Sequence, residues 1–437
     1  MIEPGLGYLV PVLREKFKQS RIIALHVDSS FPQIGVPAWR CTDTLSVQDF
    51  LERELPETDA SRIRIIEWRP SLNYYGEAYL NLLSQVVEFI KRVDAGQRTT
   101  NAFGRRWVRN FFKNVGNLQK AVLYRETEIP VIVTGSGPGL ETAIPVIRQL
   151  QESCLVMAAS SSITALERGG ITADIAVATD GGAWALQHIY PYFRGSERAL
   201  AFASSLFAAL PSQCGSIPNL VMNDGSFWQS IVLHELGIPS VIIPQKGTVA
   251  ASAVELALLL SSGNIYLAGM DFSVRDIRTH ARPYGFDHLS WGSASRFSPV
   301  YSQSFIRSGL IQKGGSYGVY ASWFKNRLSA WPKRIFTLGN NHTIFENTGS
   351  PKPAGKKDKS DYFKAVQLDN DPAAFRKKGA ASLLKAMETP GYAAKVKAEL
   401  TPLLFPGENE VPDRELRRAI EETAEGAAYQ RCKVSDG

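Results

Sequence analysis

The sequence predicts an α/β protein with a central, Rossmann-like, mainly parallel sheet that carries helices on both faces. Between residues 130 and 271, short apolar runs alternate with helical segments, and uninterrupted apolar runs are typical of strands buried on both faces. A glycine-rich turn follows the first run, as in many sheets that bind a ligand at their carboxyl edge. The expected strands are Val131–Thr134, Leu155–Ala159, Ile175–Thr179, Ala199–Ala203, Leu220–Asn223, Val241–Ile243 and Ile265–Gly269.

The glycine-rich turn lies in the sequence IPVIVTGSGPGL, from Ile129 to Leu140. A buried strand, a tight turn and a helix start form a common anion site, because glycines let the backbone approach a phosphate and unpaired helix N–H groups point at it. A dinucleotide fingerprint is excluded, since it needs a small residue in place of Leu140 and an acid about 20 residues later. An ATPase-type loop is excluded because no Gly-Lys-Ser/Thr follows. We therefore expect a nucleotide here, with a purely structural turn as the alternative.

Composition limits the classes of protein to consider. The 437 residues are 44% apolar and 21% charged, which is enough for two or three domains with sizeable cores. The chain has no run of 18 apolar residues and no secretory signal pattern, so we expect a cytoplasmic protein without a membrane partner. Four scattered cysteines form no CxxC pair, so no metal site or disulfide framework is expected. The net charge of +7 suits an acidic ligand, and no nucleic-acid motif is present.

Composition also divides the chain into five parts. We expect a small N-terminal α/β domain, a helical connector, a central nucleotide- or nucleotide-sugar-binding domain, a linker rich in Pro, Gly and Lys, and a helical C-terminal tail. Their expected bounds are 1–95, 96–129, 130–348, 349–360 and 361–437. The oligomeric state is left open.

The N-terminal part pairs a GLGY turn at Gly5–Tyr8 with Asp28, which ends the next expected strand. This pattern imitates an S-adenosylmethionine or nucleotide site, and a remnant α/β fold without ligand is the alternative. Another strand is expected at Arg62–Trp68, and helical spacing extends over residues 75–125. Residues 101–120, rich in Arg and aromatic side chains, form either a phosphate-facing surface or the solvated basic face of a connecting helix.

Polar residues follow most strands of the central domain, and parallel strands bring such residues to one edge of the sheet. They could converge on one crevice, although each alone is also a common helix cap or turn former. These residues are Ser136, Ser160, Asp180, Ser204, Asn223, Gln245 and Asp271. The polar, aromatic stretch from Asp271 to Trp291 contains Thr279-His280, and its length suggests a functional loop or lid. A helix at Ser316–Trp331 and a last strand at Arg334–Leu338 are expected after it.

Several sequence blocks occur in a characteristic order. They are GLGY, FGRRWVRNFFKNV, VTGSGPGL, AASSSITALERGGITADIAVATD, KGTVAASAVELALLLSSGNIYLAGMDFS, THA and IFENTG. Over residues 1–348 the chain resembles the motility-associated factor (Maf) family of flagellin glycosyltransferases. The central domain of that family is shared with 6-hydroxymethylpterin pyrophosphokinase-like (MptE-like) proteins and is similar in design to bacterial sialyltransferases. The resemblance implies transfer of a nonulosonic acid from a CMP-sugar to Ser or Thr of flagellin, without a required cofactor.

The resemblance also implies roles for single residues. His280, in the THA block, is the expected general base toward the acceptor hydroxyl, and Asp271 either orients it or replaces it. A loop histidine bonded to backbone is the alternative for His280. The expected nucleotide-sugar-binding residues are Gly135, Ser136, Gly137, Gly139, Ser160, Asp180, Asn223, Gly247 and Thr248. The chain departs from the family pattern twice, with Gly139 where Ser is common and with Met270 where the GQDL block has Gln.

Two other functions stay open at this point. Pyrophosphoryl transfer from ATP to a hydroxymethyl pterin would need Mg²⁺ held by carboxylates. The pterin enzymes carry paired aspartates where this chain has only Asp180, in Thr179-Asp180-Gly181-Gly182. The third candidate is a non-catalytic flagellin-binding accessory protein on the same fold, because a fold does not fix a function.

Overall fold

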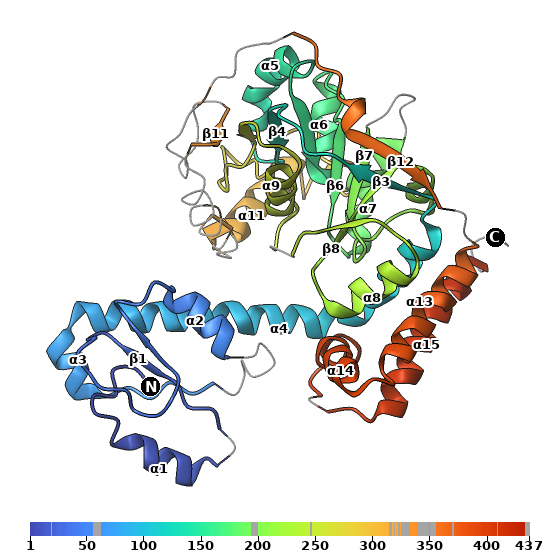
Figure 1. Ribbon diagram of the computed structural model, residues 1–437. Coiled ribbons are helices and arrows are strands. Elements are labelled where there is room, and N and C mark those ends of the chain that lie inside the picture. Colours follow the sequence, from blue (N-terminus) through green and yellow to red (C-terminus); the bar gives the residue numbers. More distant parts are fainter. Residues whose placement is uncertain are drawn as a thin grey trace. The chain divides into compact units, whose positions relative to one another are not determined.

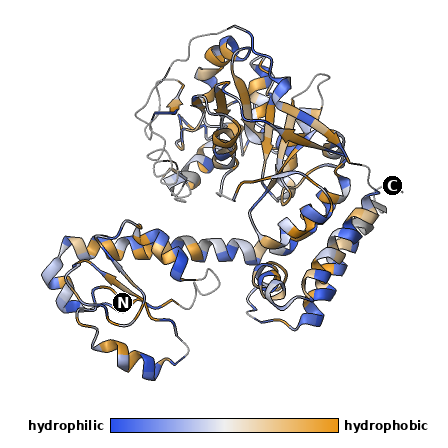
Figure 2. Cartoon of the chain, in the orientation of Figure 1, coloured by the Kyte–Doolittle hydropathy of each residue, from blue (hydrophilic) through white to orange (hydrophobic). Residues whose placement is uncertain are grey.

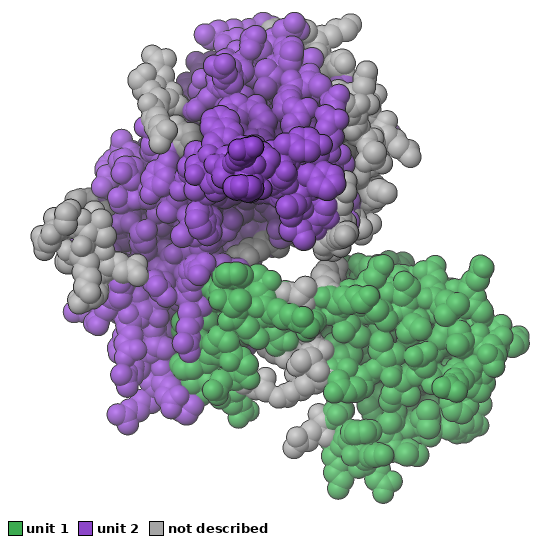
Figure 3. Space-filling view, turned by 180° about the vertical axis from the view of Figure 1, so that it is seen from behind, with its two compact units in different colours: residues 1–104, 401–411 green, residues 105–400, 412–437 purple. Residues whose placement is uncertain are grey.

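The computed structural model describes the chain as two compact units (Figure 3). Unit 1 comprises Met1–Gly104 and Thr401–Val411, and unit 2 comprises Arg105–Leu400 and Pro412–Gly437. The described residues are 1–18, 20–55, 63–193, 200–244, 247–313, 317–318, 320–321, 324, 333–338, 349, 355–368, 371–408 and 410–432. Most of the expected helix Ser316–Trp331 and part of the expected linker 349–360 lie outside these residues.

Unit 2 is built on a ten-stranded, mainly parallel sheet, which confirms the predicted fold class. Its strand order is β11-β10-β4-β5-β6-β7-β8-β3-β12, and β9 also pairs with β8. Among the described strands every pair of this sheet is parallel except β12 with β3. The strands are β3 (Lys120–Tyr124), β4 (Val131–Thr134), β5 (Leu155–Ala159), β6 (Ile175–Ala178), β7 (Ala201–Ser205), β8 (Asn219–Asn223), β9 (Ser240–Ile242), β10 (Ile265–Ala268), β11 (Ile335–Thr337) and β12 (Phe363–Gln367).

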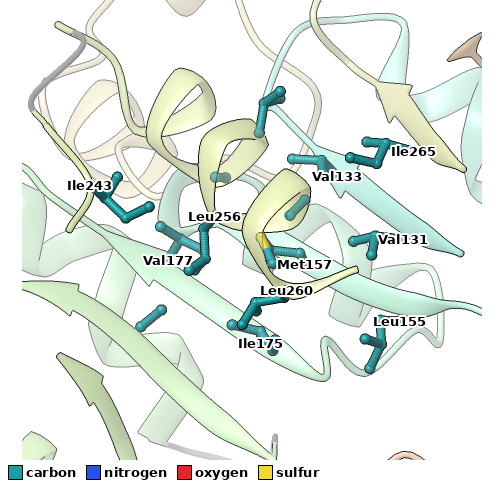
Figure 4. Packing of buried hydrophobic residues seen from close by; sticks show 14 of the residues in the cluster. Val131, Val133, Leu155, Met157, Ile175, Val177, Ile243, Leu256, Leu260 and Ile265 are labelled. Atoms are coloured by element: carbon teal, nitrogen blue, oxygen red, sulfur yellow. The ribbon is translucent and has the colours of Figure 1, made fainter. Parts of the chain in front are cut away.

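Helices cover both faces of this sheet (Figure 1). Successive side chains of a strand point to opposite faces, so Val131 and Val133 of β4 join the core under α9 (Val249–Leu260), whereas Ile132 joins the other core. That second core includes residues of α5 (Leu140–Leu150) and α6 (Ile163–Arg168). Figure 4 shows Leu256 and Leu260 of α9 lying over the strands. The apolar runs of the sequence are therefore strands with two buried faces, as predicted.

The remaining helices of unit 2 surround this sheet or extend from it. Among them, α13 packs against both α8 and α15. Their bounds are α7 (Leu186–Ile189), α8 (Phe227–Glu235), α10 (Asp287–Gly292), α11 (Val300–Lys313), α13 (Pro372–Ala386), α14 (Pro390–Leu404) and α15 (Asp413–Cys432). Short 3₁₀ helices are η2 (Ser160–Ser162), η3 (Ala183–Ala185), η4 (Tyr190–Phe193), η5 (Ser212–Ser216) and η6 (Ser360–Tyr362).

Two strands of the sheet lie where helix was predicted. β3 falls at the end of the expected helical stretch 75–125, and β12 lies within the expected helical tail. They pair antiparallel, from Lys120 opposite Gln367 to Tyr124 opposite Phe363. β12 is an edge strand and has no buried residue, and β3 beside it has two, so both carry little of the apolar pattern by which the other strands were recognised. The helical part of the tail is confirmed by α13, α14 and α15.

Unit 1 is a small α/β unit with a two-stranded parallel sheet. Its elements are α1 (Leu9–Lys16), β1 (Ala24–His26), β2 (Ala38–Arg40), α2 (Val47–Glu54), α3 (Arg69–Tyr75) and the first part of α4 (Glu77–Asn117). The predicted strand Arg62–Trp68 is wrong over 63–68, where Glu67 forms only an isolated bridge with Ile2. Residue 62 lies outside the described residues.

Buried polar contacts hold the start of unit 1. The carboxylate of Glu3 accepts hydrogen bonds from the backbone N–H groups of Val27 and Asp28 and lies 3.0 Å from Nδ1 of His26. Asp28 in turn accepts from the hydroxyl of Tyr75 at 3.0 Å. These contacts favour the remnant fold without ligand over a nucleotide site, because the carboxylate expected to hold a ribose is already hydrogen-bonded.

Apolar residues concentrate along the strands of the unit 2 sheet, which are largely orange in Figure 2. Within the described part of the chain, no helix combines the length and hydropathy that a membrane span requires.

Candidate functional site

The sheet of unit 2 has a topological switch point between β4 and β10. The chain passes from β4 to β5 on one side, whereas the much later β10 pairs with β4 on the other side. In open parallel sheets the loops leaving two such strands diverge, and ligands bind in the crevice between them. The glycine turn follows β4, and Gly269–Asp271 follow β10, so the structure brings these two predicted features to the same place.

Direct hydrogen bonds join these two loops. The N–H of Gly137 donates to the carbonyl of Gly269 at 2.7 Å, and the N–H of Gly135 donates to Ala268 at 2.8 Å. The N–H of Gly139, at the start of α5, donates to Oδ2 of Asp271 at 2.7 Å. The expectation that these amides are free for phosphate is therefore corrected, since the protein itself accepts their hydrogen bonds.

The close approach also explains why glycines stand in this turn. A Cβ on Gly137 would lie 2.2 Å from Oδ2 of Asp271, and a Cβ on Gly139 would lie 2.2 Å from its Oδ1. Asp271 is only 5% exposed, so its carboxylate is a fixed part of the turn. Phe272, which follows it, has φ +45°, a conformation that costs a non-glycine residue energy and that is often found at functional sites.

The THA block lies against the glycine turn. The N–H of Ala281 donates to the carbonyl of Ser136 at 2.8 Å. Glu141, in the first turn of α5, holds both flanks of the block, because it accepts from the Arg278 guanidinium at 2.9 Å and from the N–H of Arg282 at 2.9 Å. His280 is thereby placed at the carboxyl edge of the sheet, next to the turn, as the sequence predicted.

The imidazole of His280 is largely buried and tightly held. Its ring stacks on Tyr284 with centroids 4.1 Å apart, and its Nδ1 lies 2.9 Å from the hydroxyl of Thr279. Burial is the main cause that lowers its pKa to about 3, and the positive charge of Arg307 contributes. The ring is therefore neutral at pH 7, and its pKa lies well below the range near neutral pH in which a general base works best.

His188 belongs to the same cluster. It is 8% exposed, and its ring packs against Tyr284 and Phe286 at centroid distances of 4.8 and 4.6 Å. Burial lowers its pKa to about 4, while the negative charge of Asp180 opposes that shift. The positive charge of Arg307, on α11, lowers the pKa of both histidines.

Side chains of α4 contact the turn Asp180–Gly182, which follows β6. Asp180 is exposed, and its Oδ1 accepts from the N–H of Gly182 at 2.8 Å. Asn110 of α4 donates to the carbonyl of Gly181 at 3.2 Å, and Trp107 lies directly under Gly181, where a Cβ would be 2.6 Å from the indole. The exposed Arg109 lies on the solvated face of the same helix, in agreement with the connecting-helix interpretation.

The other predicted binding residues are spread along the sheet edge. Thr248 caps α9, because its hydroxyl accepts from the N–H of Ala251 at 3.0 Å, and Gly247 before it has φ +76°. Ser160 is buried in η2, whereas its neighbour Ser161 is the residue whose hydroxyl reaches Ser136, at 3.0 Å.

Asn223 and Ser204 are not brought to the glycine turn. Asn223 donates to Ser240 at 3.0 Å and accepts from the N–H of Gly225, and Ser204 donates to Asn219. β8, which ends at Asn223, is four strands away from β4, or roughly 19 Å at the usual strand spacing. Gln245 lies outside the described residues.

Sequence reasoning missed several members of this site. These residues have no motif of their own, and only the structure reveals them through their contacts or their charges near the THA block: Glu141, Arg282, His188, Tyr284 and Arg307. Among the described residues, no group of three or more His, Cys, Asp or Glu side chains is arranged to hold a metal ion.

Comparison with known proteins gives three findings. Residues 105–276 match the family model described as 6-hydroxymethylpterin diphosphokinase MptE-like. An uncharacterised protein of Treponema pallidum (strain Nichols) is 27% identical over 330 residues, which cover 75% of this chain and 70% of that protein. The structure of the Maf glycosyltransferase from Magnetospirillum magneticum AMB-1 aligns with 98% of this chain and 73% of that chain, at 14% identity and a TM-score of 0.47.

The matched stretch 105–276 lies within unit 2 and contains the glycine turn, the Asp180 turn and Asp271, while His280 follows it by four residues. The resemblance to MptE-like proteins is thus confirmed for residues 105–276 of the central domain.

Proposed function

We propose that this chain is a cytoplasmic Maf-type glycosyltransferase that transfers a nonulosonic acid from a CMP-sugar to a Ser or Thr hydroxyl of flagellin. The observation that carries the proposal is the bond from the N–H of Ala281 to the carbonyl of Ser136, which seats His280 at the switch point of the sheet. A partly exposed, neutral imidazole at a nucleotide-binding edge suits a hydroxyl acceptor that must lose a proton. The sequence blocks of the family supply the identity of donor and acceptor.

In the proposed reaction the acceptor oxygen attacks the anomeric carbon of the sugar. The bond from that carbon to the phosphate oxygen breaks, CMP leaves with the electron pair, and the acceptor proton passes to Nε2 of His280. Nε2 takes this role because Nδ1 faces the hydroxyl of Thr279. Asp271 serves as a positioning residue, since it locks the glycine turn against which the THA block rests.

The low pKa of His280 fits this role only when the donor is bound. A pKa of about 3 makes the free imidazole a weak base at pH 7. A CMP-nonulosonic acid carries a phosphate and a carboxylate, and negative charge close to an imidazolium raises its pKa. The donor would offset the positive field of Arg307, so the base becomes stronger in the complex than in the free protein.

The proposal is tested with purified protein, CMP-nonulosonic acid and flagellin, by CMP release and by the mass gain of flagellin. Loss of a positioned base costs roughly 10²–10⁴-fold in rate. His280→Ala and His280→Gln should both show this loss with unchanged CMP affinity, whereas the exposed His288→Ala is the matched control and should keep full turnover. Wild-type rates in both His280 variants would remove His280 from the reaction.

Pyrophosphoryl transfer is the second candidate, because the family model over residues 105–276 is named for a pterin diphosphokinase. The same preparation given ATP, a hydroxymethyl pterin and Mg²⁺ would then release AMP. We expect sugar transfer that persists in EDTA and no AMP release. Activity that EDTA abolishes and Mg²⁺ restores would support the second candidate, and flagellin binding without either product would support an accessory protein.

A further inference from the structure

A groove lies on the side of the THA block, formed by unit 2 alone. Its volume is about 510 Å³, within the size range of ligand pockets, and its lining includes Arg168, Ile277, Arg278, Arg282, Trp291 and Tyr301. Arg278 and Arg282 each lie two residues from His280, so their Cα atoms are within about 7 Å of the Cα of His280. The groove and the proposed base therefore share one short backbone segment.

Two of the three arginines that line the groove are paired with carboxylates. Arg278 pairs with Glu141 at 2.9 Å and with Asp276 at 3.7 Å, and Arg282 pairs with Asp287, so these two cations are neutralised within the protein. Arg168, exposed in the last turn of α6, has no ion-pair partner among the described residues. A single negative side chain of a partner would therefore be attracted to Arg168.

Aromatic side chains on the groove are unusually exposed. Trp291 is 63% exposed and Tyr301 is 67% exposed. Trp, Tyr and Arg are the side chains that contribute most often to the energetic centres of protein interfaces. Exposed aromatic walls beside a lone cation favour a polypeptide over a nucleic acid, which would need several phosphate-binding cations.

We infer that this groove binds the acceptor polypeptide through an Asp or Glu that lies within a few residues of the modified Ser or Thr. The inference rests on the proposed function, because it assigns the hydroxyl next to the bound segment to His280. Apolar residues of the acceptor contact Trp291 and Tyr301, and its carboxylate pairs with Arg168. Specificity for the acceptor then depends on residues outside the nucleotide site.

The test measures binding by calorimetry without any sugar donor, so it stands whether or not transfer occurs. Two synthetic twelve-residue peptides share a central Ser and apolar flanks, and differ only in carrying Glu or Lys beside the Ser. The full-length protein should prefer the Glu peptide, and higher salt should weaken that preference. Arg168→Glu should lower its affinity about 3–10-fold, since reversal removes an exposed ion pair and adds repulsion. Arg168→Lys should keep most of the affinity for the Glu peptide, because the positive charge is retained.

The exposed Arg109→Glu changes charge equally, on α4, and should leave the affinity unchanged. Trp291→Ala should weaken both peptides, because it removes apolar contact rather than charge. Equal affinity for the two peptides, no binding of either at 1 mM, or equal loss in Arg168→Glu and Arg109→Glu would each overturn the inference. So would a single-stranded oligonucleotide that binds more tightly than the Glu peptide and depends on Arg168.

Discussion

Gly139→Ala tests whether Asp271 fixes the glycine turn. Gly139 has φ −65° and ψ −15°, which any L-residue adopts, so the substitution carries no backbone strain. At such positions Gly→Ala stabilises a protein by about 0.4–1 kcal/mol through the unfolded state. Here, however, the new Cβ would lie 2.2 Å from Oδ1 and 3.0 Å from Cγ of Asp271. The carboxylate must move, although it is 5% exposed and has little space to move into.

The expected change in the free energy of unfolding combines two destabilising effects, overpacking and a lost hydrogen bond, with one stabilising effect on the unfolded chain. Overpacking of a buried site costs about 1–3 kcal/mol. Displacing the carboxylate also breaks its 2.7 Å bond to the N–H of Gly139, and hydrogen bonds to charged groups contribute about 1.5–3 kcal/mol. After subtraction of the entropic gain, we expect Gly139→Ala to lower the free energy of unfolding of unit 2 by about 2–5 kcal/mol. In an Asp271→Ala background the same change should be neutral or stabilising.

Urea unfolding followed by circular dichroism gives the free energy of unfolding of the four proteins of this cycle: wild type, Gly139→Ala, Asp271→Ala and the double variant. Hydrogen exchange of the α5 amides shows where in the protein stability is lost. Gly309→Ala is the matched control: Gly309 lies in α11 with open space around its Cβ position, so the substitution should stabilise by roughly 0.5–1 kcal/mol. The steric argument would be refuted if Gly139→Ala left the free energy of unfolding of the otherwise wild-type protein unchanged. It would also be refuted if the coupling energy between Gly139→Ala and Asp271→Ala were below about 0.5 kcal/mol.

Two further predictions concern the histidine cluster. The pKa of His188 in the folded protein is about 4, below its ordinary 6.5, so the unfolded chain binds more protons between these two values and stability falls as the pH drops from 6.5 to 4. His188→Leu should flatten this fall when thermal unfolding is measured at pH 4.5–7. An unchanged dependence of stability on pH would contradict a buried, neutral ring. Arg307→Gln should raise the pKa of both His188 and His280 in NMR titrations, because the charge of Arg307 lowers both values. Arg296→Gln, at an exposed position before α11, serves as the control, and unmoved titration curves in Arg307→Gln would place Arg307 away from the cluster.

Much of the sheet could be predicted from the sequence because strands buried on both faces are almost wholly apolar. β4, β5 and β10 begin at the expected residues and end within one residue of the expected end. β3 and β12 could not be found in this way, since their pairing depends on contacts between residues about 240 positions apart. The predicted strand Arg62–Trp68 was wrong over residues 63–68, because among the described residues this segment pairs with its surroundings only through the bridge between Ile2 and Glu67.

The candidate site shows the same division. A glycine turn, a strand-ending aspartate and a loop histidine could be predicted, because each is a local pattern, and the structure joins all three through Gly139, Asp271, Ala281 and Ser136. What the glycines contact could not be predicted, because the sequence does not show that the Asp271 carboxylate lies directly against Gly137 and Gly139. The low pKa of His280 could not be predicted either, because it depends mainly on burial and also on the charge of Arg307, which belongs to a later helix.

The position of Asp271 also bears on where a nucleotide phosphate binds. Its carboxylate lies at the N-terminus of α5, the point at which glycine turns usually receive an anion. Two unit charges 4 Å apart repel by about 4 kcal/mol at an effective dielectric constant near 20, so a phosphate placed there would bind weakly. In the proposed reaction, the cation of Arg307 and the start of α9 at Thr248 would be better partners for the phosphate than the N-terminus of α5. Asp271→Asn keeps the shape and the acceptor for Gly139 but removes the charge. If the phosphate lies away from α5, this variant should change CMP affinity less than about threefold in calorimetry, whereas Arg307→Gln should weaken it. A tightening of tenfold or more in Asp271→Asn, equal to about 1.4 kcal/mol, would instead place the phosphate against the glycine turn.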